Sequence, residues 1–430
     1  MINIERLTTQ SKELYIKNLK SRSESVHQDV LIAVDEILKD VEKNGDKAVI
    51  KYTNKFDSKN IYENNLRVTD SEIKEAYEIV DEKFVKALKL AKENISFFHE
   101  KQKQNSWMTN KADGVILGQK VTALETVGIY VPGGTAAYPS SVLMNTIPAK
   151  VAGVSKVVMV TPPSEDGKIN PNILVAADIA EVDVIYKVGG AQAVGALAYG
   201  TDTIPKVDKI VGPGNIYVAM AKKNVYGNVD IDMIAGPSEI LIISDETGEA
   251  KFIAADLMSQ AEHDVLASSI LVTTSMELAE KVNEELARQI ELLSRKDIIL
   301  KSLKDYGAII VVDDLKTAVD VSNEIAPEHL EVMVKDPFLL LGDIKNAGSI
   351  FLGKYSPEPL GDYAAGPNHV LPTNGTAKFY SALSVDDYIK KSSYIYYSDT
   401  ALGKIKDDIV TLAETEGLTA HANSIKVRYE

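Results

Sequence analysis

The chain has 430 residues, 45% of them hydrophobic and 25% charged, with a formal net charge of −15. This length allows about three domain-sized units with a large core, and the acidic balance argues against nucleic acid or an anionic membrane as a partner. No apolar run approaches the ~20 residues of a spanning helix, no N-terminal signal pattern is present, and the absence of cysteine excludes thiolate chemistry and suits a cytoplasmic protein.

The elements fall into three regions along the chain. Residues 1 to about 110 carry apolar residues at three- and four-residue spacing, which predicts helices. From about residue 115, β-branched runs alternate with helical segments, a pattern typical of parallel sheets with helical crossovers. The last fifty residues are predicted to form a helical tail. The expected strands are Thr126–Val131, Lys156–Val160, Asp183–Val188, Lys209–Val211, Ile240–Ile243, Ser269–Val272, Ala308–Val312 and Ser349–Phe351.

Three glycine-bearing turns follow expected strands closely. They are the segments 130–134, 188–192 and 211–215, and Asn215 is a candidate N-cap for the helix after the third turn. In a parallel sheet all three turns would lie at the carboxyl edge, where ligands bind and helix N-termini can face phosphates. None of them matches Gly-x-Gly-x-x-Gly, so ordinary tight turns between strands and helices remain the alternative.

A second group of residues suits a metal bound by nitrogen and oxygen. Gln260 and His263 are three residues apart in an Ala-rich helical pattern, so both side chains are expected on one helix face. With Asp362, in a loop rich in glycine and proline, and His421, near the end of the tail, they would form a set that leaves positions open for substrate. A surface pair, a turn-forming aspartate and a solvent-exposed histidine are the alternatives.

Glu328 and His329 form a candidate acid–base pair. Histidine titrates near neutrality, and an adjacent carboxylate could handle a second proton or a water. The alternative is a plain helix start, with Pro327 in its first turn and an acid that favours the helix dipole. His369 is expected to have a structural role or to support a metal ligand.

Together these stretches resemble the histidinol dehydrogenase family over essentially the whole chain. The similarity rests on long strings that occur in order, namely Tyr130–Gly134, Gly189–Ala193, Gly212–Asn215, Ala235–Glu239, Ser259–His263, Ala326–Glu331, Gly361–Thr373 and Leu418–His421. The resemblance implies oxidation of L-histidinol to L-histidine through histidinal, with two NAD, by a zinc-dependent homodimer of histidine biosynthesis. Its fold would be α/β, with two incomplete doubly wound (Rossmann-like) parallel-sheet domains, one inserted in the other.

The resemblance also assigns residues. It implies zinc at Gln260, His263, Asp362 and His421, one ion per subunit, and NAD at Tyr130, Gln192 and Asn215. Glu328 and His329 would be catalytic. Ser238, Glu358 and Glu416 would contact the substrate together with His329 and the zinc ligands, and Glu358 would hold its amine. Glu416 and His421 argue for histidinol over the small alcohols or diols used by paralogues.

The family pattern implies four segments with shared active sites in a homodimer. A helical N-terminal segment would cover residues 1–25, and a main α/β domain with the zinc and catalytic residues would cover 26–129 plus 238–381. An inserted NAD-binding domain would cover 130–237, and a C-terminal dimerisation tail 382–430.

The absence of cysteine constrains the second oxidation. Aldehyde dehydrogenases commonly form a thiohemiacetal on a cysteine, and this chain has none. Water must therefore add to the aldehyde, with Glu328 as its base, while His329 accepts protons in both hydride transfers. A dehydrogenase for another small amino alcohol or diol, a zinc hydrolase and a non-catalytic zinc-stabilised protein are the competing hypotheses.

Overall fold

The computed structural model describes residues 2–8, 15, 18–19, 22, 28–133, 138–234 and 236–430. The chain divides into two compact units, one formed by residues 1–102 and 124–388 and the other by 103–123 and 389–430. The expected helical segment 1–25 lies largely outside the described residues. Within it, Ile4–Arg6 form a strand, β1.

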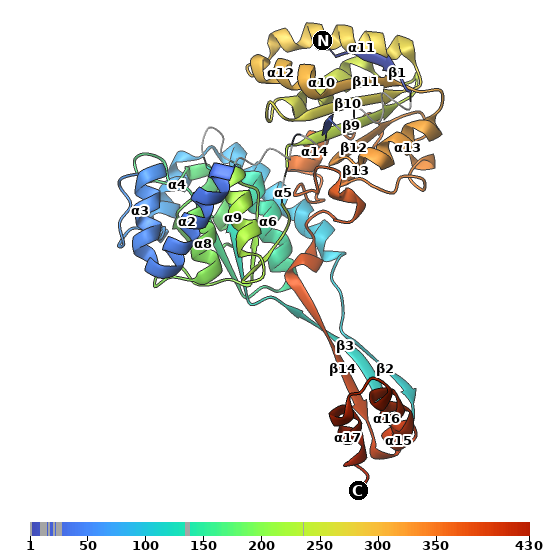
Figure 1. The fold of residues 1–430 in the computed structure, drawn as a ribbon. Helices are drawn as coiled ribbons and strands as arrows, with labels where there is room; N and C mark the ends of the chain where they lie inside the picture. Colours follow the sequence, from blue (N-terminus) through green and yellow to red (C-terminus); the bar gives the residue numbers. More distant parts are fainter. Residues whose placement is uncertain are drawn as a thin grey trace. The chain divides into compact units, whose positions relative to one another are not determined.

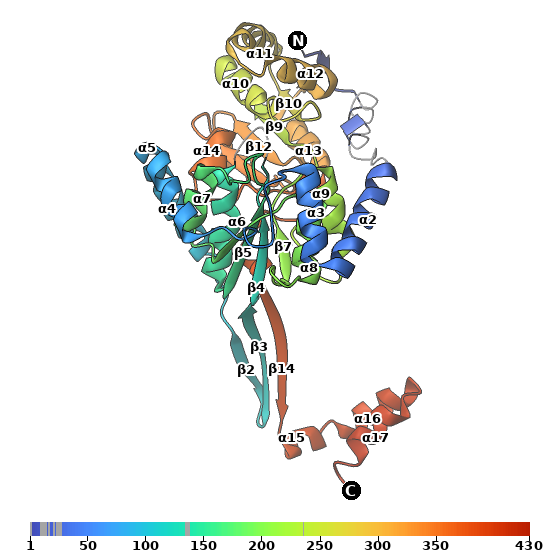
Figure 2. The ribbon, with the colours of Figure 1, turned by 90° about the vertical axis from the view of Figure 1, so that its left-hand side faces the viewer.

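The first unit contains a parallel five-stranded sheet in the order β6-β5-β4-β7-β8 (Figures 1 and 2). Its strands are β4 (Thr126–Tyr130), β5 (Lys156–Thr161), β6 (Val184–Lys187), β7 (Lys209–Val211) and β8 (Asp230–Ile231). One face packs on α2 (Gln28–Asn44), α3 (Asp46–Phe56), α8 (Gly190–Tyr199) and α9 (Ile216–Val225). The other face packs on α4 (Asp70–Ile79), α5 (Glu82–Glu100), α6 (Pro139–Ala152) and α7 (Pro171–Ile179).

The same unit contains a parallel six-stranded sheet in the order β1-β11-β10-β9-β12-β13. Its other strands are β9 (Glu239–Ser244), β10 (Ser268–Thr273), β11 (Gly307–Val311), β12 (His329–Met333) and β13 (Ser349–Leu352). One face packs on α10 (Ala250–Ala261), α11 (Met276–Gln289), η1 (Ile290–Leu292) and α12 (Lys296–Tyr306), and the other on α13 (Leu315–Ile325). The remaining elements of the unit are η2 (Pro337–Leu339), α14 (Glu358–Tyr363), η3 (Thr376–Lys378) and η4 (Val385–Tyr388).

Both sheets are doubly wound for the same physical reason. Successive side chains of a strand point to opposite faces, and strands such as β5 and β9 are apolar at nearly every position, so each face needs its own layer of helices. The strand order reverses at β4 in the five-stranded sheet and at β9 in the six-stranded sheet. The predicted α/β class, with two incomplete doubly wound sheets, is confirmed.

The core contacts divide the chain differently from the expected boundaries. Residues 26–129 were expected to belong with 238–381, but α2 to α5 pack on the five-stranded sheet. β1 pairs with β11 and so belongs to the six-stranded sheet. The five-stranded sheet and its helices, within residues 28–233, are therefore inserted in the sequence between β1 and β9 of that sheet. Apolar periodicity predicted these helices without indicating which sheet they cover, since that choice depends on contacts distant in sequence.

The second unit is a small antiparallel sheet with three helices. Its sheet has the order β14-β3-β2, formed by β2 (Trp107–Ala112), β3 (Val115–Ala123) and β14 (Ile389–Tyr397). The prediction of a wholly helical tail is wrong for β14, which is rich in the isoleucine and tyrosine that favour strands. The helices are α15 (Asp399–Gly403), α16 (Lys406–Thr415) and α17 (Thr419–Lys426).

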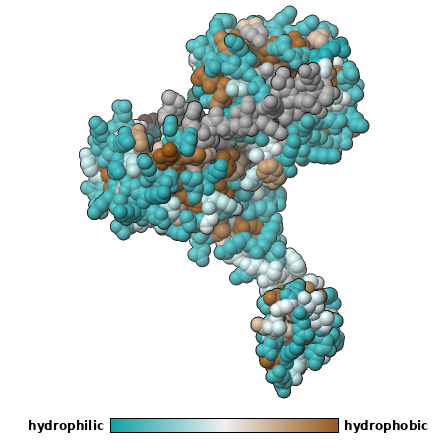
Figure 3. All heavy atoms as spheres, in the orientation of Figure 1, coloured by the Kyte–Doolittle hydropathy of each residue, from teal (hydrophilic) through white to brown (hydrophobic). Residues whose placement is uncertain are grey.

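Hydrophilic residues dominate the face of the chain drawn in Figure 3, with apolar residues in scattered groups. This surface agrees with the excess of 62 acidic over 47 basic residues. Among the described residues, no helix combines the length and apolar character required to cross a membrane.

Candidate active site

A cavity of about 460 Å³ in the first unit is lined by both sheets. The five-stranded sheet contributes its carboxyl edge, through the turn Gly212–Asn215 after β7. The six-stranded sheet contributes its amino edge, because Ser238 precedes β9 and Glu328 precedes β12. Opposite edges of two similar sheets therefore meet at one site.

The local sequence explains how Glu328 and His329 reach this cavity. Helix α13 ends at Ala326, which adopts a left-handed conformation with φ of 54°, and the following Pro327 cannot continue a helix. The chain then enters β12 at His329. The alternative of a helix starting at Pro327 is wrong, and the interpretation that the pair projects into a cavity is the one that fits.

The main chain of Glu239 holds both members of this pair. Its N–H donates to Oε2 of Glu328 at 2.9 Å, and its carbonyl oxygen lies 3.0 Å from Nδ1 of His329. Since a carbonyl can only accept, Nδ1 carries the proton and Nε2 keeps a free lone pair. That Nε2 is buried, has no hydrogen-bond partner among the described residues, and lies 3.9 Å from Oδ1 of Asp362.

Burial sets the protonation of the pair. It lowers the pKa of His329 to about 3, which keeps the imidazole neutral, and it raises the pKa of Glu328 well above its usual range. A neutral imidazole with an unpaired ring nitrogen can accept a proton, and a carboxylate with a raised pKa is a stronger base than an ordinary glutamate.

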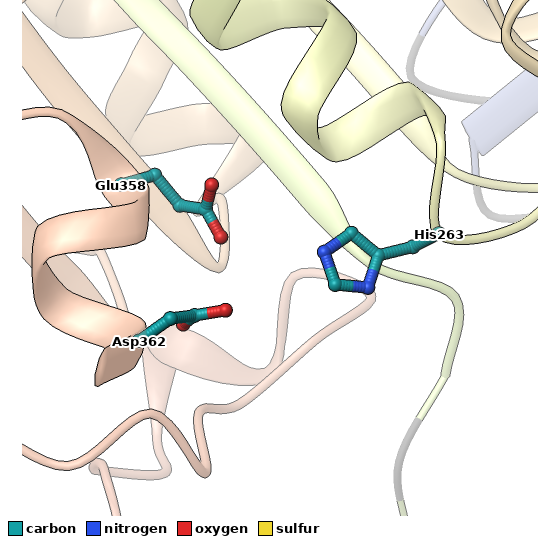
Figure 4. A group of neighbouring side chains, drawn as sticks. All are labelled: His263, Glu358 and Asp362. Carbon is teal, nitrogen blue, oxygen red and sulfur yellow. The ribbon is translucent and has the colours of Figure 1, made fainter. Parts of the chain in front are cut away.

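Three possible metal ligands converge beside the pair (Figure 4). One ligand atom each from His263, Glu358 and Asp362 lies within 4.8 Å of the others. Oε1 of Gln260 is buried without a hydrogen-bond partner in the described part of the chain, and this residue lines the same cavity. His263 lies in the turn just after α10 rather than on the helix itself, so the expected shared helix face is replaced by a helix end.

The two carboxylates among these possible ligands, Glu358 and Asp362, lie on one short helix. Glu358 is the first residue of α14 and Asp362 the last but one, and the Ser259 hydroxyl donates to Glu358 at 3.0 Å. Nδ1 of His369 donates to the main-chain oxygen of Asp362 at 3.1 Å. His369 thus supports the end of α14, the helix on which Asp362 lies instead of the predicted loop, and this contact fits the supporting role predicted for His369.

A buried carboxyl pair anchors this short helix. Oε1 of Glu331 accepts the main-chain N–H of Glu358 at 2.7 Å, and Glu331 interacts with Asp256 of α10. Burial raises the pKa of Asp256 to about 7 and that of Glu358 to about 8, and it raises the pKa of Glu331 well above its usual range. Burying several ionised carboxyl groups together destabilises the fold unless protons or a cation neutralise their charge.

The turns of the five-stranded sheet gather the residues predicted to bind NAD. The N–H of Gly190 donates to the Tyr130 hydroxyl at 3.0 Å. The amide of Gln192 is buried, and neither its oxygen nor its nitrogen has a hydrogen-bond partner within the described ranges. Asn215 is the N-cap of α9, accepting from the N–H groups of residues 217 and 218, as predicted.

The structure brings most of the predicted site residues of the first unit to one cavity. Ser238, Gln260, His263, Glu328, His329, Glu358, Asp362 and Asn215 all line it. Glu416, at the end of α16, and His421, on α17, belong to the second unit, where both are exposed. Their participation in the site remains a prediction.

Sequence reasoning missed the residues that support the site from behind. Glu239 pairs with Arg22 at 2.5 Å, and both side chains are almost fully buried. Lys222 pairs with Asp232 and donates to the carbonyl of Gly212 at 2.9 Å, which fixes the turn after β7. The only signal in the sequence was a charged residue inside an otherwise apolar run, as with Glu239 before Ile240–Ile243 and Lys222 in α9.

Comparisons with known proteins establish the family of the chain. The family model described as "Histidinol dehydrogenase" matches residues 20–429. The chain is 64% identical to the histidinol dehydrogenase of Clostridium acetobutylicum over 97% of its own length and 96% of the relative. The chain belongs to the histidinol dehydrogenase family.

Other members of the histidinol dehydrogenase family support the assignment. The chain is 61% identical to the protein from Caldanaerobacter subterraneus subsp. tengcongensis, with 96% of this chain and 95% of that protein covered. The crystal structure of histidinol dehydrogenase from Elizabethkingia anophelis superposes with a TM-score of 0.94 at 40% identity, covering 99% of this chain and 98% of that one. The predicted family is confirmed, and the chain is an oxidoreductase.

Proposed function

We propose that this member of the histidinol dehydrogenase family oxidises L-histidinol to L-histidine through histidinal, reducing two NAD in the last steps of histidine biosynthesis. The single observation that carries the proposal is the main-chain clamp of Glu239 on Glu328 and His329. It presents a free imidazole nitrogen and a carboxylate to the same cavity as the possible metal ligands.

The donors in the cavity fit a zinc ion. Gln260 offers an unpartnered buried oxygen, His263 and Asp362 converge, and the chain has no cysteine, so the set is nitrogen and oxygen only. We propose that these three residues and His421 would hold the ion. When bound, zinc would orient the substrate and stabilise negative charge on its oxygen.

The chain's own residues account for the first oxidation. Nε2 of His329 accepts the hydroxyl proton while the carbinol hydride passes to NAD, which yields the aldehyde and NADH. The carbonyl of Glu239 stabilises the resulting imidazolium through the Nδ1 proton. Ser238, Glu358, Glu416 and His421 are proposed to position the substrate, with Glu358 at its amine.

The second oxidation requires a hydrate, because an aldehyde cannot lose hydride and become an acid without an added oxygen. Glu328 takes a proton from water as the water oxygen bonds to the aldehyde carbon, and the former carbonyl oxygen takes the proton held by the His329 imidazolium, which leaves His329 neutral again. The gem-diol then loses a proton to His329 and a hydride to a second NAD, leaving the carboxylic acid. The raised pKa of Glu328 suits this role as a base.

We also propose that the protein is a cytoplasmic homodimer in which the tail of one subunit completes the active site of the other. Support comes from the family, and from the exposure of Glu416 and His421 on the second unit.

The test is to supply histidinol and histidinal separately and to follow NADH and the acid product. We expect two NADH per histidinol consumed, loss of both activities in His329→Asn, and loss of turnover on chelation with circular dichroism unchanged. Absence of NAD reduction with histidinol by zinc-loaded protein would contradict the proposal. Full activity in protein shown by elemental analysis to be metal-free would remove zinc from it.

A further inference from the structure

The short helix α14 begins without a side-chain cap of its own. The residue before it, Pro357, makes no side-chain hydrogen bond to the helix. A helix start leaves main-chain N–H groups without partners inside the helix, and a buried one needs an acceptor from elsewhere. The buried N–H of Glu358 donates to Oε1 of Glu331 at 2.7 Å. Glu331, 27 positions earlier in the sequence, therefore caps α14.

Strand β12 carries this cap on the same face as the catalytic base. His329 and Glu331 are two residues apart on the strand, so their side chains point to one face of the sheet. Phe351 of β13 pairs with Glu331 in the register of the sheet, and its ring centroid lies 6.0 Å from that of His329. A Cβ added to Gly361 of α14 would come within 2.7 Å of the same phenyl ring. The strands beside His329 thus hold α14 both at its start and along its length.

Glu331 also joins α14 to α10. Its carboxyl group forms a side-chain hydrogen bond with Asp256 of α10. Burial raises the pKa of both acids, and the hydrogen bond lowers the pKa of Asp256 and raises that of Glu331, so Glu331 is the donor. The same helix carries Gln260, and His263 follows its last turn. One side chain therefore connects the three elements that bear the proposed ligands and the base.

Two further contacts hold α14, each at a different point. The Ser259 hydroxyl holds the carboxylate of Glu358, and Nδ1 of His369 holds the main-chain oxygen of Asp362. Both act on groups other than the main-chain N–H that starts the helix. The ligand atoms of His263, Glu358 and Asp362 lie within 4.8 Å of one another. A small shift of the helix start would therefore move the carboxylates away from the imidazole.

We propose that Glu331 is a positioning residue for the reaction, which caps α14 from β12 and so places Glu358 for the amine of histidinol and Asp362 for the metal. The inference rests on the proposed function and adds to it a residue that touches neither substrate nor metal. The length of the side chain matters and its charge does not, because a neutral amide can both accept the N–H and donate to Asp256. Binding should depend on Glu331 more than the chemical steps do, since Glu239 holds Glu328 and His329 separately.

The first experiment measures zinc affinity without turnover, by competition with a chromophoric chelator. Glu331→Asp keeps a carboxyl group but shortens the side chain and withdraws the cap, so zinc should bind about ten- to a hundredfold more weakly. Glu331→Gln keeps the length and should bind zinc as the wild-type protein does. Wild-type affinity in Glu331→Asp, or equal losses in both variants, would overturn the inference. If Glu331→Asp does not fold, a loss of affinity in Glu331→Gln is still sufficient to contradict it.

Thr273→Val is the matched control for the loss of a buried acceptor. Thr273 is a fully buried residue of β10 in the same sheet, and its hydroxyl oxygen accepts the N–H of Ser275 at 3.1 Å. It does not line the active-site cavity. The variant should unfold at a lower temperature and keep its zinc affinity. A loss of zinc affinity as large as in Glu331→Asp would attribute the effect to general destabilisation and contradict the positioning role.

The second experiment compares histidinol with its analogue that lacks the amino group, at saturating zinc. In Glu331→Asp the KM for histidinol should rise about ten- to a hundredfold, with kcat changed much less and the KM for the analogue close to the wild-type value. Glu331→Gln should restore the preference for the amine. An unchanged preference in Glu331→Asp would overturn the inference.

Glu358→Gln separates a failure of this inference from a failure of the proposed function. If Glu358→Gln loses the preference for the amine and Glu331→Asp keeps it, only the positioning role of Glu331 is wrong. If Glu358→Gln also keeps the preference, the proposed contact between Glu358 and the amine is wrong. The zinc affinity of Glu331→Asp tests the placement of Asp362 in either case.

Discussion

At the scale of single residues, Glu328 and His329 are both held by the main chain of Glu239 but do different chemistry. Glu328→Gln keeps the acceptor for the N–H of Glu239 and removes the base that activates water. We expect histidinal oxidation to fall by about 10²–10⁴ and histidinol oxidation to fall much less, whereas His329→Asn should depress both. Steady-state NADH formation with each substrate is the measurement. Equal losses on alcohol and aldehyde in Glu328→Gln would reduce Glu328 to a positioning residue.

The buried acids make the stability of the metal-free protein depend on pH. In the unfolded chain aspartate and glutamate lose their protons near pH 4, whereas burial raises the pKa of folded Asp256 to about 7. Between these values the folded state binds more protons, so stability is greatest in mild acid and falls as pH rises towards 7 and above. Thermal unfolding of chelated protein from pH 5 to 8 should show a decreasing midpoint.

Glu331→Gln tests the source of that slope. The amide still accepts the N–H of Glu358 but cannot ionise, so the midpoint should vary less with pH than in the wild-type protein. Glu63→Gln, at an exposed position, serves as the control and should leave the slope unchanged. A slope identical in both variants would show that Glu331 does not contribute to it.

At the scale of elements, the turn after β7 requires glycine at position 212. Gly212 has φ of +109°, and an added Cβ would lie 2.1 Å from the main-chain oxygen of Tyr130. Gly227 has a similar φ of +104° but nothing within 4 Å. Alanine at either position should cost about 1–3 kcal/mol for the backbone strain, and only Gly212→Ala should also displace β4 and weaken NAD binding. Urea unfolding of both variants measures the backbone strain that they share, and NAD titration measures the clash expected only in Gly212→Ala. Equal NAD affinity in the two variants would contradict the close approach of Gly212 to Tyr130.

Elements were predicted well where a strand is apolar and poorly where it carries function. All eight expected strands start and end within one residue of the structure, for example Lys209–Val211. β12, the strand that carries His329, was missed because Glu328, His329 and Glu331 break its apolar pattern. Polar residues inside an apolar run make such a strand hard to predict, and the same residues indicate the site. Their burial serves chemistry rather than packing.

The site was predictable only as far as short motifs reach. Gln260, His263, Glu328, His329 and Asp362 were identified from the sequence and lie together. Arg22, Glu239 and Glu331 were not, because each acts through a contact with a segment distant in sequence, such as the separation of 217 positions from Arg22 to Glu239. Spacing along the chain contains no information about such contacts.

At the scale of the whole molecule, the proposed sharing of sites between subunits predicts complementation. His329→Ala and His421→Ala should each be inactive alone. If the tail of one subunit serves the other, an equal mixture after subunit exchange should recover about one quarter of wild-type activity, since half the dimers are hybrids with one intact site of two. Mass spectrometry should confirm the exchange. No recovery in demonstrated hybrids would confine each site to one chain.

The clamp formed by Glu239 also affects what mutagenesis can reveal. Both hydrogen bonds to the catalytic pair come from the main chain of Glu239, one from its N–H and one from its carbonyl, whereas its side chain pairs with Arg22. Eighteen of the nineteen possible substitutions at position 239, all except proline, retain that N–H and carbonyl. A scan of all substitutions at this position would therefore report on the ion pair with Arg22 and not on the main-chain hydrogen bonds to Glu328 and His329. Replacing the amide between Ser238 and Glu239 by an ester, through semisynthesis or an α-hydroxy acid, would remove the N–H donor to Glu328 while leaving the carbonyl that orients His329.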